Sequence, residues 1–278
     1  MSVAARPRIV SLLPSATDIL VALGAGAELV GVSHSCSGEW GHLPKLTSTW
    51  LDTGASAREI DTQVKTASQP LYRLDIEMLD RLTPDVIVSQ SLCDVCAVPS
   101  GDVLEAVHSL TSRPVLVDLA PHRLADIPTC FANVGSAIGQ GGKARALQEY
   151  WHDTLVSYRG RYARHDLSVA FLDWLVPPFV AGHWIPDMIA LLGLQNVLGA
   201  SGEPSFETTW EDIHAAAPDL VIAACCGFDA ERAGRDEIET ALPFRLLDGH
   251  RHFSRPSPAL LPSLALLSDT IAEFVEHG

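Results

Sequence analysis

The sequence predicts an α/β protein in which two similar lobes, each built on a parallel sheet, are joined by a long helical segment. Three observations support this prediction. Short apolar runs alternate with amphipathic stretches in both halves of the chain, which favours parallel strands covered by helices. Pro84-Asp85 and Pro218-Asp219 lead into apolar runs at equivalent places in the two halves. Residues 127–164, between those halves, carry almost no strand signal.

Each element of the first half has a local signal. The apolar run 9–13 has the length of a strand, and the amphipathic stretch 18–23 ends at Gly24, as helices commonly do. The pattern then predicts a strand over 29–33, a helix over 76–82, a strand over 86–89, a helix over 103–110 and a strand over 115–119.

The second half repeats this order after the helical segment. From Ala144 the linking segment has helix-forming residues with apolar positions three to four apart, which predicts one or two long helices. The pattern then predicts a strand over 169–172, a helix over 183–192, a strand over 220–224, a helix over 230–242 and a helix over 260–275. The predicted domains are an N-terminal α/β lobe over 1–125, a connecting helix region over 126–165 and a C-terminal α/β lobe over 166–278.

Composition limits the classes of partner. The chain has 278 residues, of which 47% are hydrophobic and 19% charged, so it can bury a sizeable core. A formal net charge of −15 repels phosphate backbones and anionic lipids, which argues against nucleic acid and membrane surfaces as partners. We find no uninterrupted apolar run long enough for a transmembrane helix. Six cysteines are too few for a disulfide scaffold in a chain of this length.

The N-terminus superficially resembles a secretion signal, because a basic start is followed by an apolar, alanine-rich stretch. Pro14 and Asp18 interrupt that stretch, and the same residues are predicted to form the first strand and helix. We therefore expect this segment to belong to the mature fold and the protein to be cytoplasmic.

The predicted topology indicates where a ligand would bind. In open α/β sheets, ligands lie beyond the carboxyl ends of the strands. The segments that follow predicted strands are 34–36, 90–96, 173–184 and 225–228. We expect them to face a cleft between the two lobes.

Several motifs at these places resemble the helical-backbone periplasmic binding-protein superfamily, which contains vitamin B12 and iron-siderophore binding proteins. The broad resemblance is carried by RIVSLLPSATDILVALG, PDVIV, GHWIPDMIALLG and PDLVIAACCGF. More narrowly, VGVSHSC, LYRLD, QSLCDVCAV, FLDWLVPPFVAGHW, CCGF and HFSRPSP resemble a leaderless "cobalamin-binding protein" branch. The resemblance covers roughly residues 8 to 275. It implies two Rossmann-like lobes bridged by a rigid helix, with a ligand such as cobalamin or another corrinoid held between them.

By the same resemblance, Glu77 and Glu211 fall where secreted relatives present carboxylates to the arginines of an importer. Importer docking is not expected of a protein without a leader. Each glutamate begins a predicted helix, where an acid stabilises the helix dipole by about 0.3 to 1 kcal/mol.

The cysteines are candidate metal ligands. Cys93 and Cys96 form a C-x-x-C pair that could place two thiolates on one metal ion, with His34, Cys36 and Cys225 as further donors after predicted strands. The alternatives are a reversible disulfide, or cysteines that line the cleft or simply pack as small apolar residues.

Aromatic residues gather near the predicted loops. A corrin or haem macrocycle needs flat apolar walls, and Trp50, Trp174, Trp184 and Phe228 are the candidates to supply them. The alternative is that these rings seal loops onto the core.

His183 and Asp173 are the polar candidates of the second lobe. His183 follows Gly182 and could donate a hydrogen bond to a ligand, coordinate a metal such as cobalt or act as a base. Asp173 comes just after a strand, beside Trp174. We find no Ser-His-Asp, HExxH, Walker or GxGxxG signature, so the sequence leaves open whether the protein is an enzyme.

The leading prediction is a cytoplasmic binding protein for a corrinoid or similarly bulky small molecule. One alternative is a binding-protein fold repurposed as a biosynthetic enzyme that uses His183, Asp173 or a cysteine. Another is a Cys/His metal-binding protein, with Cys36, Cys93, Cys96 and Cys225 as the metal candidates. The identity of the ligand and the oligomeric state are left open.

Overall fold

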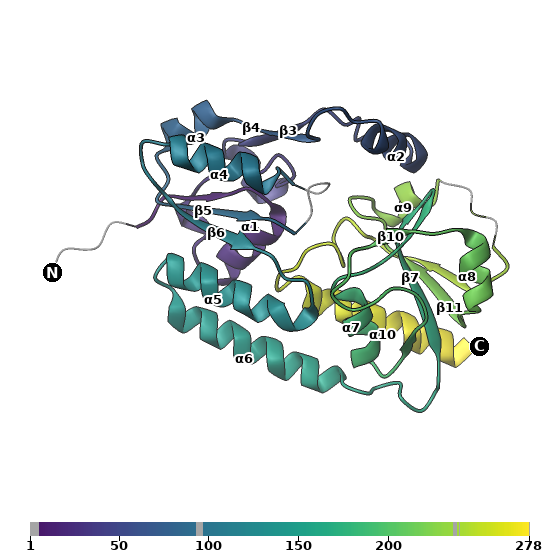
Figure 1. Cartoon of the computed structure of the whole chain (residues 1–278). Helices are drawn as coiled ribbons and strands as arrows, with labels where there is room; N and C mark the ends of the chain where they lie inside the picture. Colours follow the sequence, from purple (N-terminus) through teal and green to yellow (C-terminus); the bar gives the residue numbers. More distant parts are fainter. Residues whose placement is uncertain (1–5, 93–96, 236–237, 239, 278) are drawn as a thin grey trace. The chain divides into compact units, whose positions relative to one another are not determined.

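The computed structural model describes residues 6–92, 97–235, 238 and 240–277, and it divides the chain into two compact units. Unit 1 comprises Met1–Asp52, Gln63–Ala120 and Pro128–Glu149. Unit 2 comprises Thr53–Thr62, Pro121–Ile127 and Tyr150–Gly278. Both units combine a sheet with surrounding helices, which confirms the predicted α/β class (Figure 1).

Unit 1 contains a parallel sheet with the strand order β2-β1-β5-β6. The inner strands are buried along their whole length, as the continuous apolar runs predict. In the register, Ile9 lies between Leu29 and Val86. The four strands are β1 (Ile9–Ser11), β2 (Leu29–Val32), β5 (Val86–Gln90) and β6 (Val115–Leu119).

Helices flank this sheet. Figure 1 shows α3 (Ile76–Leu82) and α4 (Ser100–Ser109) on one side and α5 (Ile127–Ala137) on the other. The first helix, α1 (Pro14–Ala22), begins four residues earlier than predicted, because Pro14 is well suited to the first helical turn. A separate antiparallel pair is formed by β3 (Thr47–Thr49) and β4 (Tyr72–Leu74).

The segment predicted as one or two long helices forms two, α5 and α6 (Gly141–Tyr158). They pack closely, since a Cβ atom added at Gly135 would lie 2.5 Å from the Cβ of Ala144. The side-chain amide of Gln148 also donates a 2.8 Å hydrogen bond to the carbonyl of Pro128.

Unit 2 has a mixed sheet with the order β10-β8-β7-β11-β12, and β9 pairs with the start of β7. The centre is parallel, as predicted, whereas β8 and β10 are antiparallel additions. β8 must run antiparallel because only Val176 and Pro177 separate it from β7. The strands are β7 (Ser168–Leu175), β8 (Pro178–Val180), β9 (Gln195–Asn196), β10 (Phe206–Glu207), β11 (Leu220–Ala223) and β12 (Phe244–Leu246).

The helices of this unit are α7 (Ile185–Leu191), α8 (Trp210–Ala216), α9 (Ala230–Ala233) and α10 (Leu260–His277). The prediction of one helix over 230–242 was wrong, because α9 ends before Gly234 and Pro243 leads into β12. No described helix is long and apolar enough to cross a membrane.

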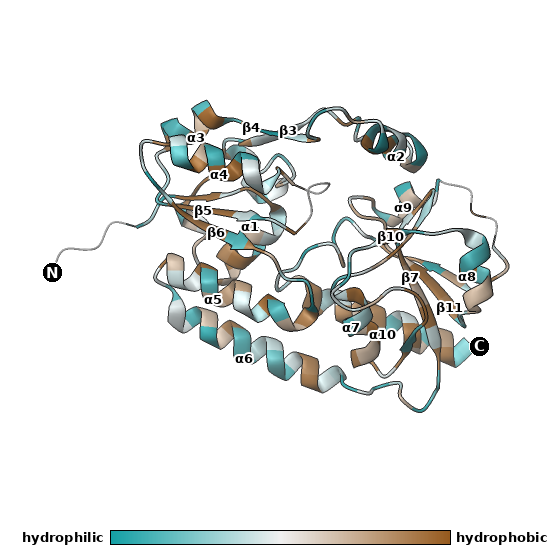
Figure 2. Cartoon of the chain, viewed as in Figure 1, coloured by the Kyte–Doolittle hydropathy of each residue, from teal (hydrophilic) through white to brown (hydrophobic). Residues whose placement is uncertain are grey.

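Helix α2 (Ala57–Lys65) was not predicted, and its first residues belong to unit 2. Ala57 is completely buried in the core of that unit, and Ile60 packs against the same core. Figure 2 shows the strands of both sheets as largely hydrophobic and much of α2 as hydrophilic, which fits a helix that buries only a narrow face.

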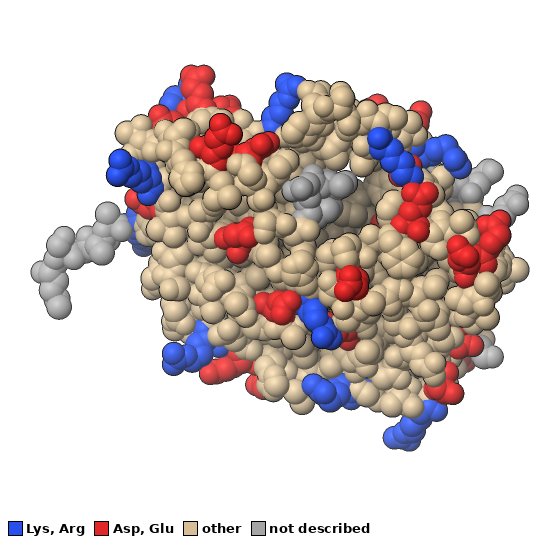
Figure 3. Space-filling view, viewed as in Figure 1, with Lys and Arg blue, Asp and Glu red and all other residues tan. Residues whose placement is uncertain are grey.

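Acidic and basic side chains are interspersed over the face shown in Figure 3. Acidic and basic side chains stand there singly or in small groups. On this face, the excess of acidic residues therefore does not form one continuous patch.

Candidate functional site

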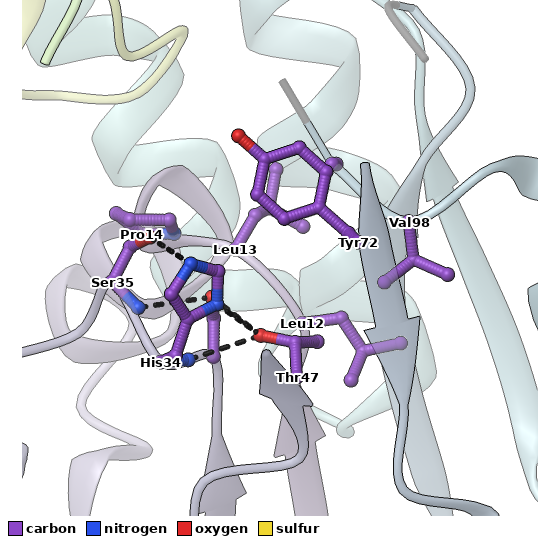
Figure 4. A pocket seen from close by; sticks show the side chains of 10 residues that line it. Leu12, Leu13, Pro14, His34, Ser35, Thr47, Tyr72 and Val98 are labelled. Carbon is purple, nitrogen blue, oxygen red and sulfur yellow. Dashed lines mark hydrogen bonds between the residues drawn. The ribbon is translucent and has the colours of Figure 1, made fainter. Parts of the chain in front are cut away.

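Unit 1 has a small pocket at the carboxyl ends of β1 and β2. Its volume of about 20 Å³ is enough for about one water molecule. A corrin or haem ring cannot enter a space of this size. The lining residues are Leu12, Leu13, Pro14, Ser33, His34, Ser35, Thr47, Tyr72, Ala97 and Val98 (Figure 4).

His34 is the most polar group of this pocket, and both of its ring nitrogens have partners. Nδ1 lies 2.6 Å from Oγ1 of Thr47, and Nε2 lies 3.3 Å from Oγ of Ser35. The backbone N–H of His34 also donates to Oγ1 of Thr47 at 3.0 Å. Figure 4 shows the imidazole beside these two hydroxyls, with the ring of Tyr72 nearby. The arrangement fixes His34 as a polar wall of the pocket.

Electrostatics keep this imidazole neutral. Burial and then the positive charge of Lys45 lower the pKa of His34 below its usual value. Burial disfavours the charged ring because a buried imidazolium loses its favourable interaction with water. Lys45 adds to this effect because its positive charge repels that of a protonated ring. His34 can therefore offer a neutral hydrogen-bonding group at the pocket.

The cysteines within the described residues are mostly packing groups. Cys36 is buried with its Sγ atom 3.3 Å from Oγ1 of Thr17, and Cys225 is buried in the core of unit 2. Among the described residues, no three His, Cys, Asp or Glu side chains are gathered so as to hold a metal ion. Cys93 and Cys96 lie outside the described residues, so metal binding by their C-x-x-C pair stays a prediction.

In unit 2, His122, His183 and Trp184 form a group that we call the histidine face. The His183 ring stacks on that of Trp184 with centroids 5.7 Å apart and an interplanar angle of 27°. It lies 6.2 Å from the ring of His122. His183 is half-buried and His122 is exposed, so the two imidazoles form the accessible part of the face.

Trp184 supports this face from below. Its side chain is only 6% exposed, and its indole N–H donates a 2.7 Å hydrogen bond to the carbonyl of Phe253. Phe253 in turn packs edge-on against Phe171, with ring centroids 5.1 Å apart. The indole is thus a buried base for His183, and little of it is available to a ligand.

The backbone holds His183 in an unusual conformation. Its φ angle is +52°, in the left-handed region that is uncommon for residues other than glycine, although histidine adopts it more often than most. Two hydrogen bonds fix this conformation, one from the His183 N–H to the Glu203 carbonyl at 2.7 Å and one from the Gly202 N–H to the His183 carbonyl at 3.0 Å. A strained backbone conformation persists only where the surrounding structure maintains it. Such conformations are therefore often found at functional positions.

Gly182 allows this close packing. A Cβ atom there would lie 2.2 Å from the carbonyl oxygen of Glu203. The Gly182 N–H donates to Oγ of Ser205 at 3.2 Å, and that hydroxyl donates to the carboxylate of Asp173 at 2.5 Å. Asp173 therefore acts through Ser205 on the loop that carries His183, as a positioning residue.

His183 is also kept neutral. Burial and the nearby His122 both lower its pKa below the usual value. The neutral ring can either donate one hydrogen bond and accept one, or bind a metal through an unprotonated nitrogen.

An ion pair anchors the loop that bears His122. The Arg123 guanidinium donates to both carboxylate oxygens of Asp187, at 2.7 and 3.3 Å, and the Leu124 N–H adds a bond of 3.1 Å. The hydroxyl of Ser201 donates to the same carboxylate. Burial alone would raise the pKa of Asp187, but these hydrogen bonds lower it overall. His122 and Arg123 were missed although they closely follow the predicted strand 115–119, so the strand-end rule could have located them. Asp187 lies inside the predicted helix 183–192, where that rule gives no signal.

The remaining aromatic candidates lie elsewhere. Trp174 packs against Phe228 with ring centroids 4.9 Å apart, and the Arg232 guanidinium lies 3.6 Å above the Phe228 ring. Phe228 is 3% exposed and therefore mainly a packing residue. Trp50 belongs to unit 1, where it is 37% exposed and its indole donates a 2.9 Å hydrogen bond to the Pro70 carbonyl.

Comparison with known protein families gives a match over most of the chain. The model of the family described as "Periplasmic binding protein" matches residues 9–240. No curated protein sequence gives a significant match.

Solved structures share the fold over nearly their whole length. The periplasmic vitamin B12 binding protein BtuF of Vibrio cholerae superposes with a TM-score of 0.70 at 17% identity, covering 98% of both chains. The periplasmic heme binding protein HutB of Vibrio cholerae gives 0.70 at 19% identity, covering 96% of this chain and 99% of its own. A possible iron-binding (periplasmic solute-binding) protein from Staphylococcus epidermidis gives 0.68 at 20% identity, with 96% and 99% covered.

Proposed function

Because the chain belongs to the periplasmic binding protein family, we propose that it binds a corrinoid or another bulky macrocycle such as haem. The observation that carries the proposal is the histidine face of unit 2, where a strained, neutral His183 rests on a buried indole. The ligands named for BtuF and HutB support the choice of a macrocycle.

The chemistry of the histidine face suits such a ligand. Rigid rings contact a flat macrocycle at little cost in side-chain entropy, and a neutral imidazole adds one directed polar contact. The pocket of unit 1 is too small to enclose a macrocycle, so we assign to His34 a contact with water or with a small substituent.

We also propose a cytoplasmic location. The stretch that resembles a secretion signal forms β1 and α1, and β1 is an inner strand paired with both β2 and β5. Cleavage after this stretch would remove that inner strand from the sheet. Fractionation of cells that express the full chain tests the location, and a periplasmic product shortened at its N-terminus would contradict it.

The binding proposal is tested by titrating the purified protein with cyanocobalamin and, separately, with hemin, followed by tryptophan fluorescence and calorimetry. We expect saturable one-to-one binding of at least one compound at micromolar concentrations or below. His183→Ala should weaken that binding about tenfold, since it removes one stacking and hydrogen-bonding group. The matched control is His108→Ala, an exposed histidine of α4 in unit 1, which should leave affinity unchanged.

Absence of saturable binding of both compounds at micromolar protein would remove this proposal. It would then favour a binding-protein fold repurposed for catalysis, and a survey by mass spectrometry of molecules retained by the protein would be the next measurement.

A further inference from the structure

The two ring nitrogens of His183 have different surroundings. Nδ1 is buried and has no hydrogen-bond partner among the described residues. The residue as a whole is only half-buried, so Nε2 is the nitrogen that water or a ligand can reach. Elsewhere in the described chain, His34 uses both ring nitrogens in contacts with hydroxyl groups.

This asymmetry decides where the proton of the neutral ring resides. A proton on Nδ1 would be a buried donor with nothing to accept it, which costs the full desolvation of that N–H group. With the proton on Nε2, that N–H donates a hydrogen bond to water in the free protein, and Nδ1 is left as a buried acceptor, which proteins tolerate more readily than an orphaned N–H. The surroundings therefore favour the tautomer that carries its proton on Nε2.

The same observation argues against His183 as a metal ligand. A histidine that binds a metal through Nε2 must carry its proton on Nδ1, and it nearly always donates that proton to a carboxylate, carbonyl or water. No described residue accepts from Nδ1 of His183. Coordination through Nε2 would thus leave an unsatisfied buried donor.

We propose that His183 is a hydrogen-bond donor, through Nε2–H, to an oxygen of the bound ligand, and that it does not serve as an axial ligand to a metal. The inference rests on the proposed function and makes the ligand class more specific. The ligand must present a carboxylate, carboxamide or carbonyl oxygen at the histidine face, as the side chains of a corrin or a haem can do.

The backbone and the neighbouring ring both serve this role. The left-handed conformation at His183 and its two backbone hydrogen bonds determine the direction of the ring. Stacking on Trp184 limits rotation of the ring, and Trp184 is itself held by its bond to Phe253. A single donor is thereby oriented before the ligand arrives, which lowers the entropy lost on binding.

The first test uses the free protein and needs no ligand. Nitrogen-15 NMR of the histidine side chains distinguishes the two neutral tautomers, and the His183 signals are assigned by comparison with His183→Gln. We expect a neutral ring protonated at Nε2. A ring protonated at Nδ1 overturns the inference, whether or not any macrocycle binds.

The second test uses three variants and cyanocobalamin or hemin, whichever binds. The amide N–H₂ of glutamine reaches about where Nε2–H lies, whereas asparagine reaches only about as far as Nδ1. We expect His183→Gln to retain affinity within about threefold, and His183→Asn and His183→Ala to lose about tenfold. Asparagine tolerates the left-handed backbone better than glutamine, so a greater loss with asparagine cannot be caused by backbone strain.

Visible spectra of the bound macrocycle show whether His183 coordinates the metal, which is the outcome that would contradict the inference. If His183 coordinated the metal, aquocobalamin or hemin would show a change of axial ligand on binding to the wild type, and both His183→Gln and His183→Ala would abolish that change. This result overturns the inference while leaving the proposed function intact. Failure of both macrocycles to bind, together with the Nε2–H tautomer, overturns the proposed function alone.

Discussion

His34 and His183 share a property at the scale of single residues, since the surroundings of each disfavour its charged form. Burial is the first cause for both, followed by Lys45 for His34 and by His122 for His183. In the folded protein each pKa lies below the usual value of 6.5. The unfolded chain therefore binds protons at these positions at a higher pH than the folded protein does.

Folding stability should consequently decrease as pH falls below 6.5. Above that value both states hold neutral rings and the two histidines have no effect on the free energy of unfolding. The slope is at most about 1.4 kcal/mol per pH unit for each histidine, and solvent screening reduces it because both rings are half-exposed. Urea unfolding curves at a series of pH values measure it.

The double variant His34→Gln/His183→Gln should flatten this part of the stability curve, while the control His108→Gln should leave its shape as in the wild type. Asp187 acts in a separate range. Its folded pKa is lowered below 3.8, so the stability it contributes is present above that value and is lost only as pH falls further. If the stability of the double variant fell below pH 6.5 as steeply as that of the wild type, the decrease could not be assigned to His34 and His183.

His34 was expected just after a strand, and it does follow β2, which ends at Val32. Asp173 was expected just after a strand but lies within β7, and His183 follows the short antiparallel strand β8, so the rule that ligands lie beyond the ends of parallel strands does not account for the place of either residue. Whether a side chain at such a position is exposed depends on contacts made far along the chain. Trp184 and Phe228 are buried for this reason, and each packs against residues distant in sequence or in other elements.

At the scale of elements, the loop before α7 packs closely against the segment 202–205. Gly182 is the point of nearest approach, and the left-handed residue His183 follows it. The ring direction of His183 thus depends on a glycine and a backbone carbonyl that belong to different segments.

Gly182→Ala should destabilise the protein by about 1 to 3 kcal/mol, because the new methyl group meets backbone atoms that cannot move aside easily. It should also weaken macrocycle binding through the displaced His183. Thermal unfolding and the cyanocobalamin or hemin titration measure the two effects. Gly41→Ala is the control, since a Cβ atom there has no described atom within 4 Å, and a silent Gly182→Ala would contradict the packing argument.

The parallel strands β1, β2, β5, β6, β7 and β11 and the long helices α6 and α10 were well predicted, whereas the helix α2 and the short strands β3, β4, β8, β9, β10 and β12 were not. The strand β6 and the helix α3 have the predicted bounds, because both are marked at their ends by proline, threonine or acidic residues. Helix α2 was missed because it buries only a narrow face and contains mostly polar residues. The antiparallel strand β8 was missed because its pairing depends on a two-residue turn within an apolar run.

At the scale of the whole molecule, the chain passes between the two units five times, so neither unit is one continuous stretch. The segment Thr53–Thr62 leaves unit 1 to join unit 2, where Ala57 is buried. The Arg232 guanidinium donates a 2.8 Å hydrogen bond to the carbonyl of Ala55 in this segment. Unit 2 therefore depends on residues encoded nearly a hundred positions before its main part.

A fragment comprising residues 150–278 lacks both Thr53–Thr62 and Pro121–Ile127, and it should be less stable than unit 2 in the full chain. The loss of the Ile60 and Ala57 contacts should account for at least about 2 kcal/mol of this difference. Urea unfolding followed by tryptophan fluorescence measures this difference. A synthetic peptide of residues 53–65 should restore part of the stability, and the same peptide carrying Ile60→Asp should not. A fragment that unfolds at the same urea concentration as the full chain would show that the segment contributes little.

Because the chain passes between the two units, parts of unit 2 are synthesised at well-separated times. Ala57 and Ile60 are synthesised early, but the core that they join includes residues of β7 and β11, which are completed only when the chain has reached Ala223. At about 5 to 20 residues per second, this leaves their apolar surface without its final partners for on the order of ten seconds. Helix α2 can remain soluble during that interval because most of its surface is polar. A mainly hydrophilic α2 thus limits the aggregation hazard that an early-made, late-docked segment creates during translation.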